Sequence, residues 1–234
     1  MRWIRLVQCL LIASLALALP TAALSVFAFD LDRNWTGDAV TVVFLFAFAC
    51  LLSTPWWPAR GQRDRSRFER LQGMVMIWFG VTFTTHLTWE LGWVVLRSEI
   101  LASPEAIWSY PWWAYIDGGD ARYASDSAQL ISLESVTAVV GALGFGALWL
   151  RHRSNGCSPT ATLMLMATAV AHIYGTVLYF GSETLDGFPN VDTTSFVDCV
   201  LKFWVLNGIW LVMPWAVLYW GRQTLYDQIA SQNR

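Results

Sequence analysis

Residues 73–96, GMVMIWFGVTFTTHLTWELGWVVL, form an apolar stretch with a single acid, Glu90, inside it. A second stretch at 128–150, AQLISLESVTAVVGALGFGALWL, likewise encloses one acid, Glu134. Each stretch exceeds the roughly 20 apolar residues that a membrane-spanning helix needs. An ionisable side chain in hydrocarbon costs about 3 kcal/mol or more, so such groups usually mark a functional site. The two stretches therefore predict membrane helices whose acids have a function.

The rest of the chain has the same membrane character. Of its 234 residues, 56% are hydrophobic and 14% are charged, whereas a soluble domain averages about 25% charged residues. Further apolar stretches at 7–29, 38–57, 160–181 and 199–221 bring the predicted spans to six. Because the spans use most of the chain, we predict an all-α, polytopic membrane helical bundle without a separate soluble domain.

Basic residues predict which side of the membrane each loop faces. The alternate loops are rich in Asp and Glu, whereas eleven of the 15 Lys and Arg residues fall at the two ends and in the second and fourth loops. Because Lys and Arg collect on the cytoplasmic side, we expect both termini in the cytosol. The eleven residues are Arg2, Arg5, Arg60, Arg63, Arg65, Arg67, Arg70, Arg151, Arg153, Arg222 and Arg234.

The first 29 residues allow two interpretations. Two arginines, an apolar run and Thr21-Ala22-Ala23 also fit a cleaved secretory signal. The apolar stretch continues to Phe29, which is longer than a usual signal core, so we expect a retained helix. The predicted organisation is then an N-terminal hydrophobic helix at 1–29, a membrane domain at 30–222 and a cytosolic tail at 223–234. Cleavage would leave five spans with the same orientation.

The predicted spans carry polar residues at a common depth. Thr82, His86 and Glu90 are spaced four apart and share one helical face. Glu90 lies seven residues from the non-cytosolic end of its span, and Glu134 lies eight residues from that same side. At about 1.5 Å per residue, both acids lie about 10–12 Å below one interface. Asn207 lies eight residues below Cys199, entering from the same side, so it continues this layer. Thr137 shares a face with Glu134, Trp210 shares one with Asn207, and His172 and Tyr179 belong to a polar stripe in the fifth span.

Such a layer could line one cavity, although each residue also has a simpler interpretation. Polar side chains in spans, the threonines and His172 among them, often only join neighbouring helices. Trp210 alone could be core or interface filler, since the chain has 15 Trp residues. The loop 97–127 is rich in aromatic residues, which collect at membrane interfaces. We expect it to form a cap on the bilayer, and it could also roof a pocket.

The chemistry of this set suits proton transfer to and from an apolar substrate. A carboxylic acid in apolar surroundings can keep its proton near neutral pH, and a His one turn away can relay it. A second carboxylate and a Trp face can stabilise a developing cation. The same cavity would also bind an amine-bearing lipophile. The sequence contains no nucleophile–base–orienter set, redox motif, metal-ligand spacing or basic patch for nucleic acid.

Five separate motifs occur in a fixed order along residues 72–221. They are HLTWE at 86–90, GDARY at 119–123, ESVT at 134–137, IYGTVLYF at 173–180 and NGIWLVMP at 207–214. In this combination the sequence resembles the emopamil-binding protein family, the sterol Δ8–Δ7 isomerases, within the wider EXPERA group.

The resemblance implies a five-helix bundle around a lipophile cavity in the endoplasmic reticulum, with residues 1–29 as an extra helix. The family's reaction adds a proton at C9 of a sterol, forms a carbocation at C8 and removes a proton from C7, with no cofactor and no metal. It implies cationic amphiphilic drugs as inhibitors and a homodimer. The implied catalytic residues are His86, Glu90 and Glu134. The predicted substrate-binding residues are Asn207, Trp210, Thr137, Tyr179 and His172.

Two other functions fit the same residues. A membrane-bound, proton-initiated terpene cyclase also begins with a buried acid and would differ in the shape of its substrate. A protein of sigma-2-receptor type would only bind sterols or cationic amphiphiles. Ligand binding alone needs one buried acid, so the full set favours an enzyme, an isomerase acting on a sterol or a related polycyclic isoprenoid.

Overall fold

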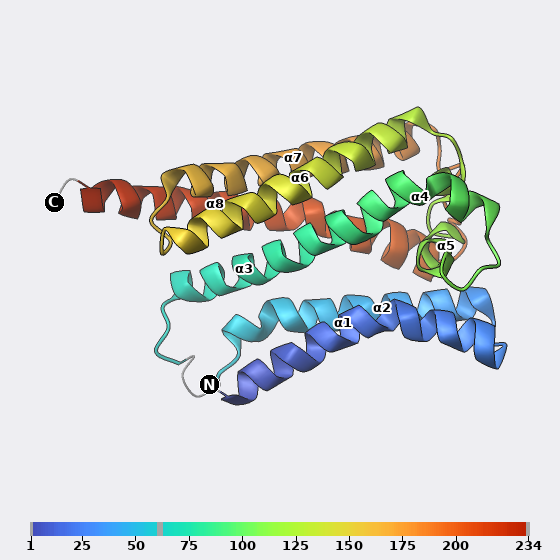
Figure 1. Ribbon diagram of the computed structural model, residues 1–234, viewed down its shortest axis with the longest axis horizontal. Helices are drawn as coiled ribbons and strands as arrows, with labels where there is room; N and C mark the ends of the chain where they lie inside the picture. Colours follow the sequence, from blue (N-terminus) through green and yellow to red (C-terminus); the bar gives the residue numbers. More distant parts are fainter. Residues whose placement is uncertain (1, 60–62, 233–234) are drawn as a thin grey trace.

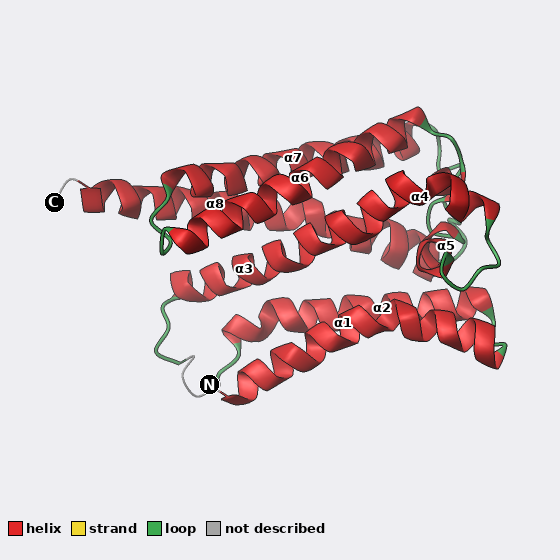
Figure 2. Ribbon diagram, viewed as in Figure 1, coloured by secondary structure: helices red, strands yellow, loops and turns green. Residues whose placement is uncertain are grey.

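The structure, a computed structural model, describes residues 2–59 and 63–232, and within these ranges every regular element is a helix (Figure 2). Arg60 and Arg234 of the predicted basic loops lie outside the described residues. The main helices are α1 (Arg2–Phe29), α2 (Arg33–Ser53), α3 (Arg67–Thr85), α4 (Leu91–Ala102), α5 (Tyr110–Ile116), α6 (Ala128–Arg153), α7 (Pro159–Leu185) and α8 (Leu206–Gln232). Short 3₁₀ turns η1 (Thr54–Trp56) and η3 (Ala121–Ala124) and π-helical segments η2 (His86–Glu90) and η4 (Val197–Val205) join them.

Five helices are long and apolar enough to cross a membrane, which confirms a polytopic helical membrane protein. They cover Trp3–Phe29, Arg33–Trp56, Ala128–Arg153, Pro159–Leu185 and Val197–Ala230. The sequence predicted six such spans. The remaining one, at 73–96, is helical but is divided among α3, η2 and α4, and none of these pieces is among the five. The interruption is a π-helical turn at the HLTWE motif, a feature that often marks functional sites.

The helices run roughly parallel to the long axis of the molecule (Figure 1). α1 and α2 form a hairpin along one side, and α6, α7 and α8 pack together on the other. The α3–η2–α4 run lies between them, while α5 and its loops close one end. Both chain ends lie at the opposite end of the molecule from α5. The predicted aromatic cap is therefore a short helix across one end of the bundle.

Local sequence signals explain where the central helices begin. Ser66 forms a capping box with Glu69 at the start of α3, and this arrangement satisfies two otherwise unpaired backbone N–H groups. Ser127 accepts a hydrogen bond from the Leu130 N–H and begins α6. Ser158 does the same for α7, where Pro159 occupies the first helical position. These caps fix the register of the helices that carry the polar residues.

Two glycines let α6 approach the central run closely. A Cβ added at Gly141 would lie 2.7 Å from the Cβ of His86, and one added at Gly144 would collide with the Phe83 ring. Phe83 is fully buried and belongs to a core cluster with Trp78 and Phe79. The absence of side chains on this stripe of α6 therefore sets the position of His86 relative to α6.

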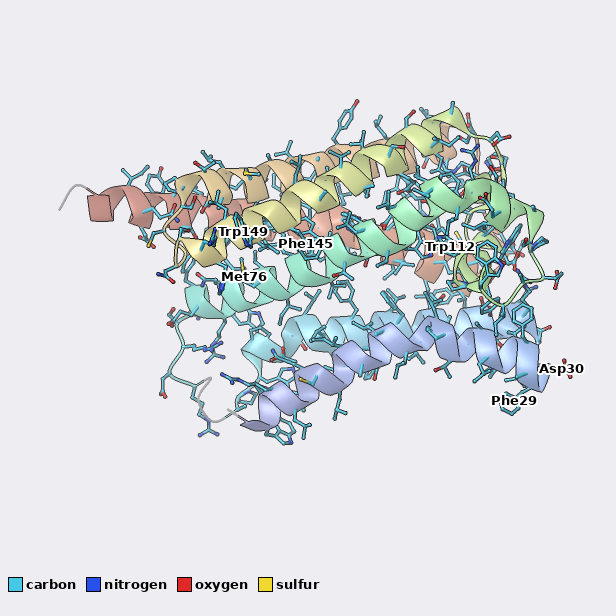
Figure 3. The ribbon with its side chains drawn as sticks, in the orientation of Figure 1. Phe29, Asp30, Met76, Trp112, Phe145 and Trp149 are labelled. Atoms are coloured by element: carbon cyan, nitrogen blue, oxygen red, sulfur yellow. The ribbon has the colours of Figure 1, made fainter. Side chains whose placement is uncertain are left out.

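The outer surface of the bundle is apolar. Large hydrophobic side chains such as Phe29 and Trp149 are mostly exposed, and Phe29 points outward at the end of α1 (Figure 3). A soluble monomer rarely exposes extensive apolar patches. This surface agrees with a chain that is surrounded by lipid.

Candidate functional site

A cavity of about 1160 Å³ is lined by residues of the α1–α2 hairpin on one side and of the rest of the bundle on the other. Its walls come from both hairpin helices, the central run, the α5 cap and helices α6 to α8. The structure brings every site residue predicted from the sequence to this one cavity. These residues are His86, Glu90, Glu134, Thr137, His172, Tyr179, Asn207 and Trp210. Thr82, placed on the same helical face by its spacing, is buried but does not line the cavity.

The π-helical turn η2 carries a buried acid and a buried histidine. His86 Nδ1 lies 3.1 Å from Glu90 Oε1, and both residues are less than a tenth exposed. The other carboxyl oxygen, Glu90 Oε2, has no hydrogen-bond partner among the described residues. Glu90, a residue that lines the cavity, therefore has one carboxyl oxygen held by the protein and one without a partner among the described residues.

His172 extends this pair from the neighbouring helix. Its Nε2 lies 2.9 Å from His86 Nε2, so Glu90, His86 and His172 form one buried chain of hydrogen bonds. The ring of His172 packs against Trp78 and Phe83, with centroids 6.3 Å and 6.4 Å away. No local pattern in the sequence predicts this contact, because 86 residues separate the two histidines.

The second acid is held by a tyrosine from the cap side of the bundle. The Tyr123 hydroxyl donates a short hydrogen bond to Glu134 Oε1. Burial raises the pKa of Tyr123 well above its usual range, so the phenol remains a donor. The Tyr123 ring packs edge-on against Trp89 and Tyr115. Accepting a hydrogen bond is the role that an ionised carboxylate takes, so this arrangement suits a negative charge on Glu134.

A directional chain of hydrogen bonds leads from the cavity to a buried ion cluster. Asn207 Nδ2 donates to the Tyr115 hydroxyl at 2.9 Å, and the two tyrosine hydroxyls of Tyr115 and Tyr179 lie 2.7 Å apart. Tyr179 then donates to Asp120 Oδ2 at 2.5 Å. Because Tyr179 donates its only hydroxyl proton to Asp120, Tyr115 must be the donor in the hydrogen bond between the two tyrosines. Burial also raises the pKa of Tyr115, which keeps that proton in place.

Arg122 closes this chain at the rim of the bundle. It pairs with Asp120 at 2.6 Å and with Glu183 at 3.3 Å, and both acids are fully buried. Its guanidinium carbon also lies 4.6 Å from the centre of the Tyr179 ring. Buried charges need such partners, because an unpaired one carries a large desolvation cost. Asp120 and Arg122 of the GDARY motif therefore hold Tyr179 in place, whereas Tyr123 of the same motif lines the cavity.

The remaining predicted residues differ in whether their side-chain polar atoms have hydrogen-bond partners. The Thr137 hydroxyl donates to Leu133 O of its own helix at 2.9 Å. Asn207 Nδ2 also bonds the carbonyl groups of Lys202 and Phe203 in the π-helical segment η4. Trp210 Nε1 is buried and has no hydrogen-bond partner among the described residues. Sequence reasoning missed Tyr115, Tyr123 and Trp89, which lie in or face the aromatic cap, although 119–123 is one of the motifs.

Comparisons with known proteins identify the family of this chain. The family model of the EXPERA (EXPanded EBP superfamily) domain matches residues 108–221. The 3-beta-hydroxysteroid-Delta(8),Delta(7)-isomerase of Rattus norvegicus is 31% identical over 183 residues, which are 76% of this chain and 76% of the relative. The protein of the same name from Cavia porcellus is 29% identical over 202 residues, covering 83% and 85%. By the extent of these matches, the chain belongs to the EXPERA family, the expanded EBP superfamily.

Proposed function

We propose that this protein is a membrane isomerase that moves a C=C bond from Δ8 to Δ7 in a sterol or a related polycyclic isoprenoid. The observation that carries the proposal is the pair of buried acids, Glu90 and Glu134, that line one largely apolar cavity. The names of the mammalian relatives support the same reaction. Because the reaction is redox-neutral, it needs no cofactor.

The resemblance to the sterol isomerases implies the order of the catalytic steps, and we propose a separate role for each of the two acids in them. The His86–Glu90 pair delivers a proton to C9, the π electrons of the double bond form the new C–H bond, and a carbocation remains at C8. The pair, now one proton short, accepts the proton that leaves C7, and the electrons of that C–H bond form the Δ7 double bond. The site then has its starting charge again. Such positioned acid–base groups contribute about 10²–10⁴-fold to rate.

Glu134 and Trp210 stabilise the cation between these two steps. A carboxylate attracts the positive charge strongly where water is excluded, and Tyr123 holds Glu134 in place. The face of an aromatic ring attracts a cation through its quadrupole, and the Trp210 ring lies 6.2 Å from the His86 ring, centre to centre. We propose Asn207, Thr137 and Tyr179 as contacts that position the substrate.

The same chemistry supports three further proposals. A cationic amphiphilic drug would inhibit the enzyme, because its ammonium group imitates the carbocation. The protein would reside in the endoplasmic reticulum, where its sterol substrate would be found, with both termini in the cytosol. It would form homodimers, as the resemblance implies. Residues 1–29, 30–222 and 223–234 are proposed as an added helix, the EXPERA-like membrane domain and a tail.

Complementation in yeast tests the reaction. A strain that lacks sterol Δ8–Δ7 isomerase receives the wild-type chain, Glu90→Gln or Glu134→Gln, and its sterols are analysed by mass spectrometry. We expect the wild type to restore Δ7 sterols and both variants to fail at equal protein levels. A well-expressed wild type that leaves Δ8 sterols unchanged would reject the sterol reaction. It would favour binding without catalysis or another isoprenoid substrate, which a labelled-amine binding assay and a cyclisation assay would separate.

A further inference from the structure

His172 is a buried titratable group that the proposed steps do not use. It is about as buried as Glu90, and its only hydrogen bond among the described residues runs from Nε2 to His86 Nε2. Its second nitrogen, Nδ1, has no hydrogen-bond partner among the described residues. This asymmetry between the two nitrogens of His172 decides how protons are arranged along the chain.

The bond between two Nε2 atoms allows two arrangements of neutral rings. In the first, His172 carries its proton on Nε2 and donates to His86, whose own proton then sits on Nδ1 and points to Glu90. In the second, His86 donates to His172 from Nε2. His172 must then carry its proton on Nδ1, because a neutral imidazole has one donor and one acceptor nitrogen.

The surroundings of His172 favour the first arrangement. The second would leave a buried N–H on Nδ1 without an acceptor among the described residues, in a ring that packs against Trp78 and Phe83. Orphaned buried N–H groups are rare in folded proteins, whereas acceptors without a partner are better tolerated. In the first arrangement, His172 Nδ1 is an acceptor without a partner among the described residues, and both nitrogens of His86 have hydrogen-bond partners.

We propose that His172 is a positioning residue that holds His86 as the tautomer with its proton on Nδ1, so that Glu90, rather than His86, delivers the first proton. Both nitrogens of His86 are then committed to protein partners. Glu90 Oε1 accepts the His86 N–H, which leaves the acid proton of Glu90 on Oε2, the oxygen without a partner among the described residues, in a residue that lines the cavity. When that O–H bond breaks, the His86 N–H already faces the new carboxylate.

The kinetic part of this inference rests on the proposed isomerase reaction, whereas the tautomer part does not. The chain has three histidines, so ¹⁵N-histidine labelling and solid-state NMR in bilayers can separate them. His172→Gln and His152→Phe each remove one histidine and assign the remaining signals. We expect a protonated Nδ1 on His86 and a protonated Nε2 on His172. A proton on Nε2 of His86 would overturn the inference.

Two substitutions of His172 test its role in turnover. A Gln side chain can still donate an N–H to His86 Nε2, so His172→Gln should keep the wild-type tautomer and most of the activity. His172→Phe keeps a ring of similar size but cannot donate. We expect it to lower kcat about 100-fold with KM little changed, because most of the contribution of a positioned general acid is lost. His152→Phe, at an exposed site on the same protein, is the control and should behave as wild type.

The outcomes separate the inference from the proposed function. Equal losses in His172→Gln and His172→Phe, or wild-type kcat in a folded His172→Phe, would overturn the positioning role. If the wild type itself turns over no sterol, the proposed function fails and the NMR result alone decides the tautomer. The NMR experiment does not depend on His172→Phe folding, so an unstable variant does not remove the test.

Discussion

The close approach at Gly141 makes a quantitative prediction for Gly141→Ala. The added Cβ would lie 2.7 Å from His86 Cβ, whereas ordinary contacts begin at 3.4 Å, so the two must separate by about 0.7 Å. The neighbouring contact with Phe83 O is already at 3.4 Å, which limits movement in that direction. Overpacking of this kind costs about 1–3 kcal/mol, and a misplacement of about 1 Å can lower a rate 10²-fold. We therefore expect Gly141→Ala to lower kcat at least about tenfold.

The assay is sterol turnover by purified protein in proteoliposomes, with thermal unfolding measured on the same samples. Gly146→Ala is the matched control, because it lies on the same helix and its added Cβ would meet nothing within 4 Å. Alanine favours a helix over glycine by about 1 kcal/mol, so the control should keep its activity and gain slightly in stability. Wild-type kcat in Gly141→Ala would refute the argument that this contact positions His86.

Three further substitutions test the supporting network. Tyr123→Phe removes the donor to Glu134 and should lower kcat about tenfold, as a turnover assay would show. Because a buried carboxyl loses its hydrogen bond, it should also lower the free energy of unfolding by about 1–3 kcal/mol, seen as a lower melting temperature. Tyr115→Phe leaves Asn207 without one acceptor and Tyr179 without one donor. It should lower the free energy of unfolding by about 1–3 kcal/mol in a denaturant titration. Arg122→Met removes the cation that pairs with the buried Asp120 and Glu183. It should lower the free energy of unfolding by about 3–5 kcal/mol, seen as a lower melting temperature. An unchanged melting temperature would contradict the role of Arg122.

Much of this site could be predicted because acids inside apolar stretches are conspicuous. Glu90 and Glu134 stand alone among apolar residues, and helical spacing alone places His86 next to Glu90. The common depth of the polar residues predicted a shared cavity, and the structure confirms one. The all-α membrane fold follows from the same apolar stretches.

Other features depend on contacts that the sequence does not encode locally. Nothing in the spacing of HLTWE distinguishes a π-helical turn from a regular one, so the division of the 73–96 span was missed. Tyr123 lies in a polar loop and reaches Glu134 only through the folding of the cap. Lys202 lies within the predicted 199–221 span, yet it is buried between Asp38 and Asp198 at 2.8 Å and 2.6 Å. Its partner on α2 is more than 160 residues away, so hydropathy could not find it.

Deuterium transfer during a single turnover tests the central claim most directly. Purified protein in excess is equilibrated in D₂O and mixed with a Δ8 sterol, and the product is analysed by mass spectrometry and NMR. Wild-type protein should give a Δ7 sterol with one deuterium at C9, and Glu90→Gln should give no product. A Δ7 product without deuterium at C9, or equal turnover by Glu90→Gln, would contradict proton delivery from this site.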